Sequence, residues 1–267
     1  MRFSELLEGL AAAGIEEAAV EARLLFSHFS GLSAAALLGA DPACSEPGLA
    51  AALSRRTSGE PLAYILGEAP FFRGSFAVGP GCLVPRADTE RLVELAIERL
   101  PRGAHFADLC TGSGAIAVSV LLDRRDTTAE AIDVSEVALD YAKRNAERHG
   151  VTDRLTLCRK DLLTATPTGR YDAILSNPPY IPSATVSTLS REVRHEPSLA
   201  LDGGADGLRF YRRLLSLAGL LTPGGFFLFE CGYDQKEAMA ALAAAAGYTF
   251  EPFYDYGKNF RVALITP

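Results

Sequence analysis

Apolar residues near the start of the chain recur at helical spacing. Leu6 and Leu10 fall on one face of a helix, and the same spacing returns between Val20 and Phe29. Glycines and an Asp-Pro pair interrupt the pattern, as expected between short helices. The pattern therefore predicts a bundle of four or five short helices, which we interpret as a separate small helical domain over residues 1–66.

A different pattern occupies residues 67–85. Aromatic and β-branched residues flank a glycine between Phe71 and Val78, which is typical of a β-hairpin. We expect this segment to be a hairpin linker. After it, Asp88 is a plausible N-cap for a helix that runs to Leu100.

From about residue 104 onward, strand-like and helix-like patterns alternate. Such alternation predicts an α/β fold with an open, mostly parallel sheet and helices on both of its faces. The last two strand candidates are joined by a short turn, so they must form an antiparallel pair at one edge. We assign residues 86–267 to this domain. The strand candidates are 104–109, 128–133, 154–158, 171–176, 225–231, 247–254 and 260–265, and the helix candidates are 113–122, 135–148, 207–220 and 234–245.

The composition narrows the class of protein. The chain has 267 residues, with 48% apolar and 22% charged residues, which is ordinary for a globular protein. A formal net charge of −7 makes duplex nucleic acid a poor default partner. Five scattered cysteines without a Cys-x-x-Cys pair indicate reduced thiols and a cytoplasmic protein, and the four histidines leave little scope for a metal site. We expect no metal, no signal peptide and no membrane span.

A glycine loop follows the first strand candidate and opens a helix. It contains Cys110, Thr111, Gly112, Ser113 and Gly114. Glycines let a ligand approach the backbone closely, and a helix N-terminus attracts negative charge. The spacing G-x-G-x-x-G is absent, which counts against a dinucleotide site.

Carboxylates stand at the ends of the next two strand candidates. Asp133 is placed to accept both hydroxyls of a ribose, and Asp161 to reach the base edge of an adenosine, with Leu162 as apolar packing beside it. Each acid taken alone also fits an ordinary helix N-cap or solvated turn. Together with the glycine loop and Asn177, however, they place polar groups at four consecutive strand ends. Because the loop has no Arg or Lys to hold a diphosphate, the ligand that fits best is S-adenosyl-L-methionine.

The segment Asn177-Pro178-Pro179-Tyr180 directly follows the strand candidate 171–176. Each proline lacks an N–H and has a fixed φ, and a residue before proline is held extended. The result is a rigid polar notch, in which the Asn177 amide and nearby backbone carbonyls can accept hydrogen bonds from an NH₂ group. Tyr180 offers a face on which a planar substrate can stack. The alternative is a proline-rich turn without a function of its own.

Further segments give the chain a family resemblance that covers nearly its whole length. Besides the glycine loop, they are Pro61-Leu62-Ala63-Tyr64-Ile65-x-Gly67, Val84-Pro85-Arg86-x-Asp88-Thr89-Glu90, Asn177-Pro178-Pro179-Tyr180-Ile181, Glu196-Pro197-x-x-Ala200-Leu201, Gly203-Gly204-x-Asp206-Gly207-Leu208 and Glu230-Cys231-Gly232 with Gln235. In these segments the chain resembles the HemK-type protein-(glutamine-N5) methyltransferases, which modify peptide chain release factors. The Asn-Pro-Pro-Tyr motif alone is shared with DNA adenine methyltransferases, whereas the joint occurrence is much more specific.

The resemblance implies a seven-stranded class I methyltransferase sheet, preceded by a helical domain that grips the release factor. It implies cofactor contacts at Cys110 to Gly114, at Asp133, near Leu162 and at Asn177. The product would be S-adenosyl-L-homocysteine. Two positions depart from the family pattern: Cys110 stands where glycine is usual, and Leu162 stands where an aromatic residue often covers the adenine.

The expected reaction is N5-methylation of the glutamine in the Gly-Gly-Gln motif of release factors. The substrate would lie against Asn177, Pro178, Pro179 and Tyr180. We expect the Asn177 oxygen and the Pro178 carbonyl to accept the two amide hydrogens, while Tyr180 stacks on the amide plane. These three are the expected catalytic residues. No strong general base is needed, because the nitrogen becomes acidic only after methyl transfer.

Three further positions have open roles. Arg86 is expected either to line the site or to pair with the helix after Asp88. Glu230 is expected to brace the interior of the sheet, and Glu196-Pro197 to shape the loop over the site. Buried acids at these positions would need partners.

The sequence is also compatible with two rival functions. An amino-methylase of adenine or cytosine in nucleic acid would use the same notch, but it needs base flipping and a basic recognition segment, and the sequence shows no such segment. A non-catalytic adaptor for a translation factor predicts damage to the glycine loop or the notch. We expect a monomer whose partners are release factors, without direct nucleic-acid or membrane contact.

Overall fold

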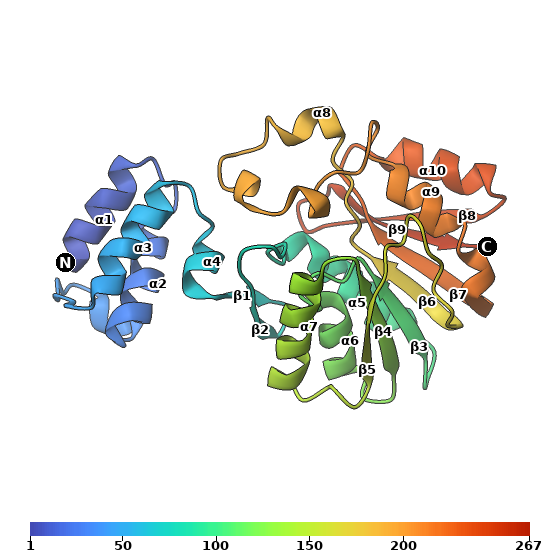
Figure 1. Ribbon diagram of the computed structural model, residues 1–267, viewed down its shortest axis with the longest axis horizontal. Coiled ribbons are helices and arrows are strands. Elements are labelled where there is room, and N and C mark those ends of the chain that lie inside the picture. Colours follow the sequence, from blue (N-terminus) through green and yellow to red (C-terminus); the bar gives the residue numbers. More distant parts are fainter. The chain divides into compact units, whose positions relative to one another are not determined.

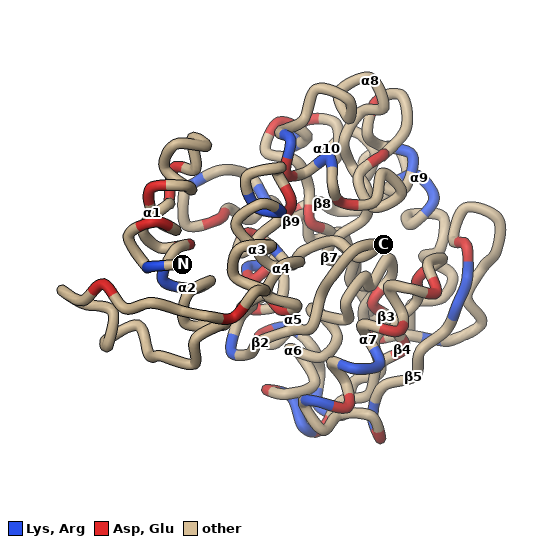
Figure 2. The backbone as a smooth tube through the Cα atoms, turned by 60° about the vertical axis from the view of Figure 1, so that its left-hand side comes forward, with Lys and Arg blue, Asp and Glu red and all other residues tan.

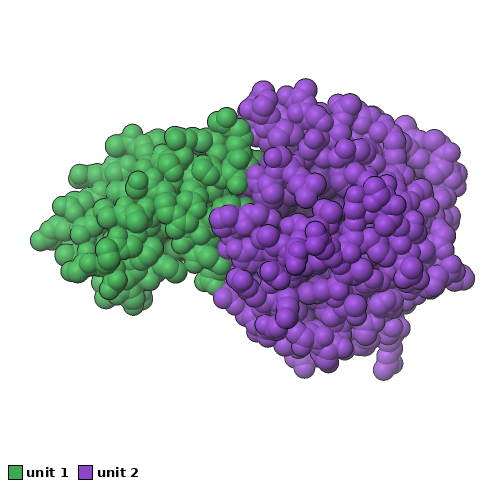
Figure 3. All heavy atoms as spheres, viewed as in Figure 1, with its two compact units in different colours: residues 1–68, 190–195 green, residues 69–189, 196–267 purple.

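The computed structural model describes residues 1–267, which divide into two compact units (Figure 3). Unit 1 comprises Met1–Glu68 together with Ser190–His195. Unit 2 comprises Ala69–Leu189 and Glu196–Pro267. The predicted domain limits stay a prediction, and Ser190–His195 is a segment that no local pattern assigns to the helical part. None of the helices has the length and apolar character required to cross a membrane.

Unit 1 is a small bundle of helices. Its interior is a cluster of fully buried side chains, among them Leu6, Leu10, Phe26 and Leu49. Helix breakers separate its elements, as at Gly31, which ends one helix in the left-handed conformation with φ +71°. The elements are α1 (Phe3–Ala12), α2 (Ala18–Ser30), a 3₁₀ helix (Ala34–Leu37), α3 (Pro47–Thr57) and α4 (Leu62–Leu66).

The hairpin expected after the helices is present as β1 (Glu68–Phe71) and β2 (Gly74–Ala77). The predicted role of Asp88 as a helix cap is wrong. Asp88 lies within a 3₁₀ turn (Ala87–Thr89), and α5 (Glu90–Arg99) begins after it without a side-chain cap. The Asp88 carboxylate instead pairs with Arg261 at 2.9 Å.

The central sheet of unit 2 has seven strands in the order β5-β4-β3-β6-β7-β9-β8, which confirms the predicted fold class (Figure 1). The first five strands in this order are parallel to one another, and β9 is antiparallel to both β7 and β8. The antiparallel strand therefore lies one position inside the edge. The strands are β3 (His105–Leu109), β4 (Thr128–Asp133), β5 (Leu155–Arg159), β6 (Tyr171–Ser176), β7 (Leu221–Glu230), β8 (Thr249–Tyr254) and β9 (Phe260–Thr266).

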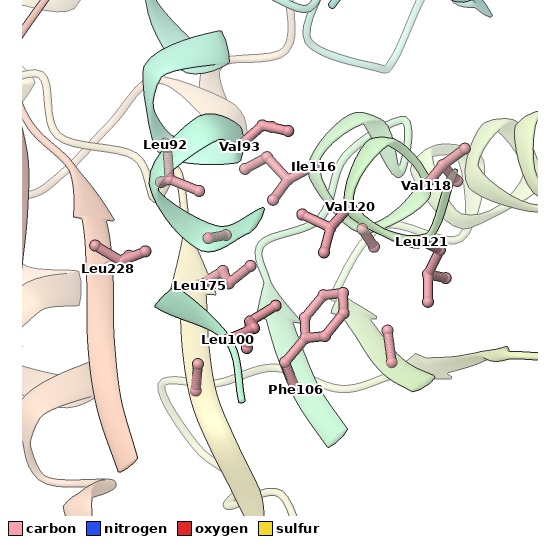
Figure 4. Close-up of a cluster of buried hydrophobic side chains, with 14 of the residues drawn as sticks. Leu92, Val93, Leu100, Phe106, Ile116, Val118, Val120, Leu121, Leu175 and Leu228 are labelled. Carbon is pink, nitrogen blue, oxygen red and sulfur yellow. The ribbon is translucent and has the colours of Figure 1, made fainter. Parts of the chain in front are cut away.

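Helices cover both faces of this sheet. On one face, α5, α6 (Ala115–Asp123) and α7 (Glu136–Arg148) cover apolar residues such as Phe106, Leu175 and Leu228 (Figures 1 and 4). On the other face lie α9 (Arg209–Leu215) and α10 (Lys236–Ala245). The helix predicted over 207–220 is shorter than expected, because α9 ends at Leu215 and a 3₁₀ helix (Ala218–Leu220) follows. Between β6 and α9 lie a short helix, α8 (Ser183–Val186), and two 3₁₀ helices (Val193–His195 and Ser198–Ala200).

The strand order fixes where a ligand site can form. β3 is paired with β4 on one side and with β6 on the other. The connection from β3 to β4 and the connection from β6 to β7 therefore leave the sheet in opposite directions. Such a switch point opens a crevice at the carboxyl ends of the strands. The segments that follow β3, β4, β5 and β6 meet at this edge.

Candidate active site

A pocket opens at the carboxyl ends of these parallel strands. Its wall brings together most of the side chains predicted to bind cofactor or substrate: Cys110, Thr111, Gly112, Ser113, Asp133, Asp161, Leu162, Asn177 and Pro179. Three predicted site residues, Gly114, Pro178 and Tyr180, do not form part of this wall. The site is thus assembled from four strand ends.

The glycine loop turns sharply at Cys110. This residue has φ +61°, a conformation that a side chain other than glycine adopts at a cost. The backbone N–H of Thr111 then donates to Ile132 in β4 at 3.0 Å, which ties the loop to the neighbouring strand. Gly114 lies beneath the loop, where an added Cβ would come within 3.2 Å of the Ala142 backbone. It therefore allows close packing of the loop against α7.

Asp108 supports the loop and was missed by sequence reasoning. Its side chain is fully buried and accepts hydrogen bonds from Thr111 Oγ1 at 2.5 Å and from the Ala117 backbone at 3.1 Å. Burial raises the pKa of Asp108 to about 7, although both hydrogen bonds oppose the rise. An acid within an otherwise apolar strand, just before the glycine loop, was the available signal.

Asp133 is held in place by the backbone on both sides. Its two carboxylate oxygens accept from Gly112 N–H and Ser135 N–H, each at 2.9 Å. Ser135 in turn caps α7 by accepting from Ala138 N–H at 3.2 Å. Burial raises the pKa of Asp133, against the effect of these hydrogen bonds. Each carboxylate oxygen retains acceptor capacity toward the pocket, since a carboxylate oxygen accepts more than one hydrogen bond.

Asp161 and Leu162 form the adjacent wall. Asp161 accepts from Leu163 N–H at 2.9 Å and from Thr164 Oγ1 at 3.1 Å, so it also organises a turn. Leu162 is buried, and Arg213 Nε donates to its carbonyl at 2.7 Å. The loop that carries both residues is therefore fixed from behind, with an apolar surface and a carboxylate facing the pocket.

The notch follows β6 as predicted. Ser176 Oγ, at the end of β6, donates to the Leu109 carbonyl at 2.5 Å and thus joins β6 to β3. Asn177 Nδ2 donates to Thr89 Oγ1 at 3.2 Å, which leaves the Asn177 side-chain oxygen as the acceptor of this amide. No backbone N–H donates a hydrogen bond to the Pro178 carbonyl. Two acceptors therefore stand next to each other in the chain.

Tyr180 supports the notch from behind. Its ring packs against the apolar cluster on the face of α9 and α10, and its hydroxyl points to Glu230 Oε1 at 3.5 Å. Gln235 Nε2 donates to the Tyr180 carbonyl at 3.1 Å. Gly203 approaches so closely that an added Cβ would lie 2.7 Å from Tyr180 Cα. These contacts give Gly203 and Gln235, which are distant from the notch in sequence, a structural role beside it.

Glu230 is buried at the end of β7 with only 1% of its surface exposed. Burial raises its pKa to about 7, although Thr89 and Arg261 both favour its charged form. Its position matches the predicted role as a brace inside the sheet.

Arg86 both lines the pocket and forms an ion pair. Its partner is the buried carboxylate of Glu196, not the helix after Asp88. Glu196 also accepts from Val84 N–H at 2.9 Å. This acid therefore connects the segment before α5, which contains Val84 and Arg86, to the loop that carries Pro197. With Lys160 and Arg209 on the same wall, the pocket offers cationic groups as well as two carboxylates.

Two family models match the chain. The model described as "PrmC N-terminal domain" matches residues 4–67, and the model described as "Methyltransferase small domain" matches residues 88–197. The first falls on the helices of unit 1. The second contains the glycine loop, Asp133, Asp161 and the notch.

Curated relatives agree with these matches. A release factor glutamine methyltransferase of Moorella thermoacetica is 42% identical over 252 residues, which are 92% of this chain and 89% of that protein. Its counterpart from Geobacter sulfurreducens is 40% identical over 245 residues, 90% of this chain and 86% of that protein. Among solved structures, a methyltransferase from Pyrococcus furiosus has a TM-score of 0.52 at 20% identity, over 71% of this chain and 86% of that one, which supports the fold alone. The chain therefore belongs to the family of release factor glutamine methyltransferases.

Proposed function

We propose that this protein methylates the N5 atom of the glutamine in the Gly-Gly-Gln motif of peptide chain release factors. The observation that carries the proposal is the orientation of Asn177, whose Nδ2 is engaged by Thr89 at 3.2 Å. Its side-chain oxygen and the Pro178 carbonyl then remain as neighbouring acceptors. A primary amide has two N–H donors, so this pair of acceptors suits it.

The pocket residues fit S-adenosyl-L-methionine as cofactor. The backbone from Cys110 to Gly114 would border the methionine part, Asp133 would accept the ribose hydroxyls, and Asp161 with Leu162 would border the adenine. The fit rests on Asp133, whose two oxygens are already aligned by Gly112 and Ser135 and keep acceptor capacity. When bound, the cofactor supplies an activated methyl group on its sulfonium and leaves as S-adenosyl-L-homocysteine.

The notch would bias the glutamine amide toward reaction. The lone pair of an amide nitrogen is delocalised into its carbonyl, so the nitrogen is a poor nucleophile. Acceptors at Asn177 and Pro178 fix its direction and stabilise the positive charge that develops on it. The nitrogen gains a methyl group and afterwards loses one proton to water. Pro179 forms part of the wall, and stacking by Tyr180 stays a prediction.

Unit 1 would provide the surface that binds the release factor. Val20 and Leu24 lie one turn apart on α2 and are 45% and 47% exposed, which leaves an apolar stripe for a partner. Methylation of nucleic acid is less well supported. Basic and acidic residues are both scattered along the backbone (Figure 2), and the net charge is −7. We propose a cytoplasmic monomer that acts on proteins.

The test combines a substrate comparison with one substitution. Purified protein and labelled cofactor are incubated with release factor, DNA and RNA, and the release factor is then mapped by mass spectrometry. We expect one added methyl group on the Gly-Gly-Gln glutamine. Asn177→Ala should abolish transfer while cofactor binding by calorimetry persists, and Asn259→Ala, in a distant turn, should change neither. Methylated DNA, or unchanged transfer by Asn177→Ala, contradicts the proposal.

A further inference from the structure

Two side chains beside the notch are buried and do not belong to the pair of acceptors that would hold the substrate. Thr89 is 4% exposed and lies in the turn before α5, and Glu230 is 1% exposed at the end of β7. On one side, Thr89 Oγ1 accepts the hydrogen bond from Asn177 Nδ2 at 3.2 Å. On the other side, Thr89 opposes the rise in the Glu230 pKa that burial causes, as a hydroxyl near a carboxylate does.

The orientation of the Asn177 amide decides whether the notch offers an oxygen or an NH₂ group. A hydroxyl donates as well as accepts, so Thr89 by itself accommodates either orientation. A carboxylate only accepts. Once the Thr89 proton is directed to a carboxylate, the hydroxyl has only lone pairs left for Asn177, which must then present Nδ2 to it.

Glu230 has the free acceptor that this arrangement needs. Its Oε1 faces the Tyr180 hydroxyl at 3.5 Å, while its Oε2 is buried and has no hydrogen-bond partner. A buried carboxylate oxygen without a donor is costly. Thr89 is a notch residue whose hydroxyl favours the charged form of this carboxylate, and a hydroxyl can donate as well as accept.

We propose that Thr89 and Glu230 are positioning residues that set the polarity of the notch. Asn177 Nδ2 donates a hydrogen bond to the Thr89 hydroxyl, and in this proposal the Thr89 hydroxyl donates its own hydrogen bond to Glu230. Tyr180 donates to the same carboxylate. One buried acid thereby turns the Asn177 oxygen toward the substrate and holds the Tyr180 ring. The inference rests on the proposed function, because it explains how the proposed acceptor is kept available.

A pH dependence follows from the charge of Glu230. Burial raises its pKa to about 7, so a large change in its ionisation falls within the working range. A protonated Glu230 has a proton of its own to donate and no longer dictates the direction of the Thr89 hydroxyl. We expect kcat to rise with pH as Glu230 ionises. The titratable and charged groups that face Glu230 are Asp88, Tyr180, Tyr211, Cys231 and Arg261.

Four variants test the proposal with release factor as substrate: Thr89→Val, Thr89→Ser, Glu230→Gln and the double variant Thr89→Val/Glu230→Gln. Thr89→Val should lower kcat by about 10- to 100-fold, the scale of leaving one buried polar group without its hydrogen bond. Thr89→Ser keeps the hydroxyl and should restore most of the activity. Glu230→Gln should lower kcat and flatten its rise with pH. The double variant should have a kcat no lower than that of the more impaired single variant, because Thr89 and Glu230 act through one chain of hydrogen bonds.

The matched control is Thr127→Val, because Thr127 is also a buried threonine and lies outside the pocket. Its hydroxyl donates to the Arg124 carbonyl at 2.8 Å. Thr127→Val should leave kcat unchanged, and calorimetry should show that S-adenosyl-L-methionine still binds every variant. Wild-type kcat in Thr89→Val, an equal loss in Thr89→Ser, or an unaltered pH profile in Glu230→Gln would overturn the inference. If Asn177→Ala is inactive while Thr89→Val is active, only this inference fails; if Asn177→Ala is active, the proposed function fails with it.

Discussion

The carboxylate of Asp133, at the end of β4, accepts a hydrogen bond of 2.9 Å from the backbone N–H of Gly112, in the loop after β3. This contact aligns the acid before any ligand arrives. We expect Asp133→Ala to weaken S-adenosyl-L-methionine binding by about 10- to 100-fold, the scale of hydrogen bonds to a charged group. Calorimetry measures the effect, with the exposed Asp153→Ala as control. Equal affinities for both variants would exclude Asp133 from the cofactor site.

Cys110 holds a backbone conformation that disfavours branched side chains. At φ +61°, Cys110→Val should destabilise the protein by roughly 1–3 kcal/mol because a β-branched residue is strained there. Cys110→Gly removes the strain and should still bind cofactor. Cys158→Val is the matched control, since Cys158 lies in strand β5, where valine is favoured. Urea unfolding compares the three variants, and equal stability of the two valine variants would contradict the prediction.

Glu230 should make stability depend on pH in a defined direction. Its pKa is raised from 4.5 to about 7 in the folded protein, so within this window the folded state keeps a proton that the unfolded state has lost. Stability contributed by protonation is therefore lost as pH rises, by roughly 3 kcal/mol across the window. Glu230→Gln lacks this loss, so it should gain stability relative to wild type between pH 5 and pH 8. Denaturation at both pH values measures the difference, and a constant difference would count against a buried, titrating Glu230.

Arg56 should be essential to the stability of unit 1. Its side chain is 6% exposed and pairs with Glu21 at 2.6 Å and with Glu192, from the segment Ser190–His195, at 3.1 Å. Arg56→Ala leaves the Glu21 carboxylate without its partner and should cost roughly 3–5 kcal/mol. Arg55 on the same helix is 45% exposed in its pair with Glu60, so Arg55→Ala should cost less than about 1 kcal/mol.

Unfolding of the full chain, combined with limited proteolysis of unit 1, distinguishes the two arginine variants. Early cleavage within residues 1–68 of Arg56→Ala, but not of Arg55→Ala, is the expected result. The same sensitivity in both would mean that burial of the Arg56 pair contributes little.

The sequence pattern does not show which partner a charged side chain meets in the folded protein. Asp88 has the residue type of a helix cap, but its carboxylate is used by Arg261, and α5 begins after it without a side-chain cap. The residue type allowed both uses, and the partner came from a strand near the other end of the chain. Asp108 was overlooked for a related reason, since its hydrogen bonds from Thr111 and Ala117 form only once the loop has folded over the end of the strand.

The sequence by itself determined the order and type of the elements and the positions of polar residues at strand ends. Periodicity, glycines and prolines act over a few residues, so they leave a local record. The tertiary structure decided that the side-chain oxygen of Asn177, and not its nitrogen, is available, because Thr89 lies 88 positions away along the chain. It also decided that Arg86 meets Glu196, and that Glu230 stands behind the notch. Such contacts join residues that are distant in sequence, and they exist only once the sheet has brought its strand ends to one edge.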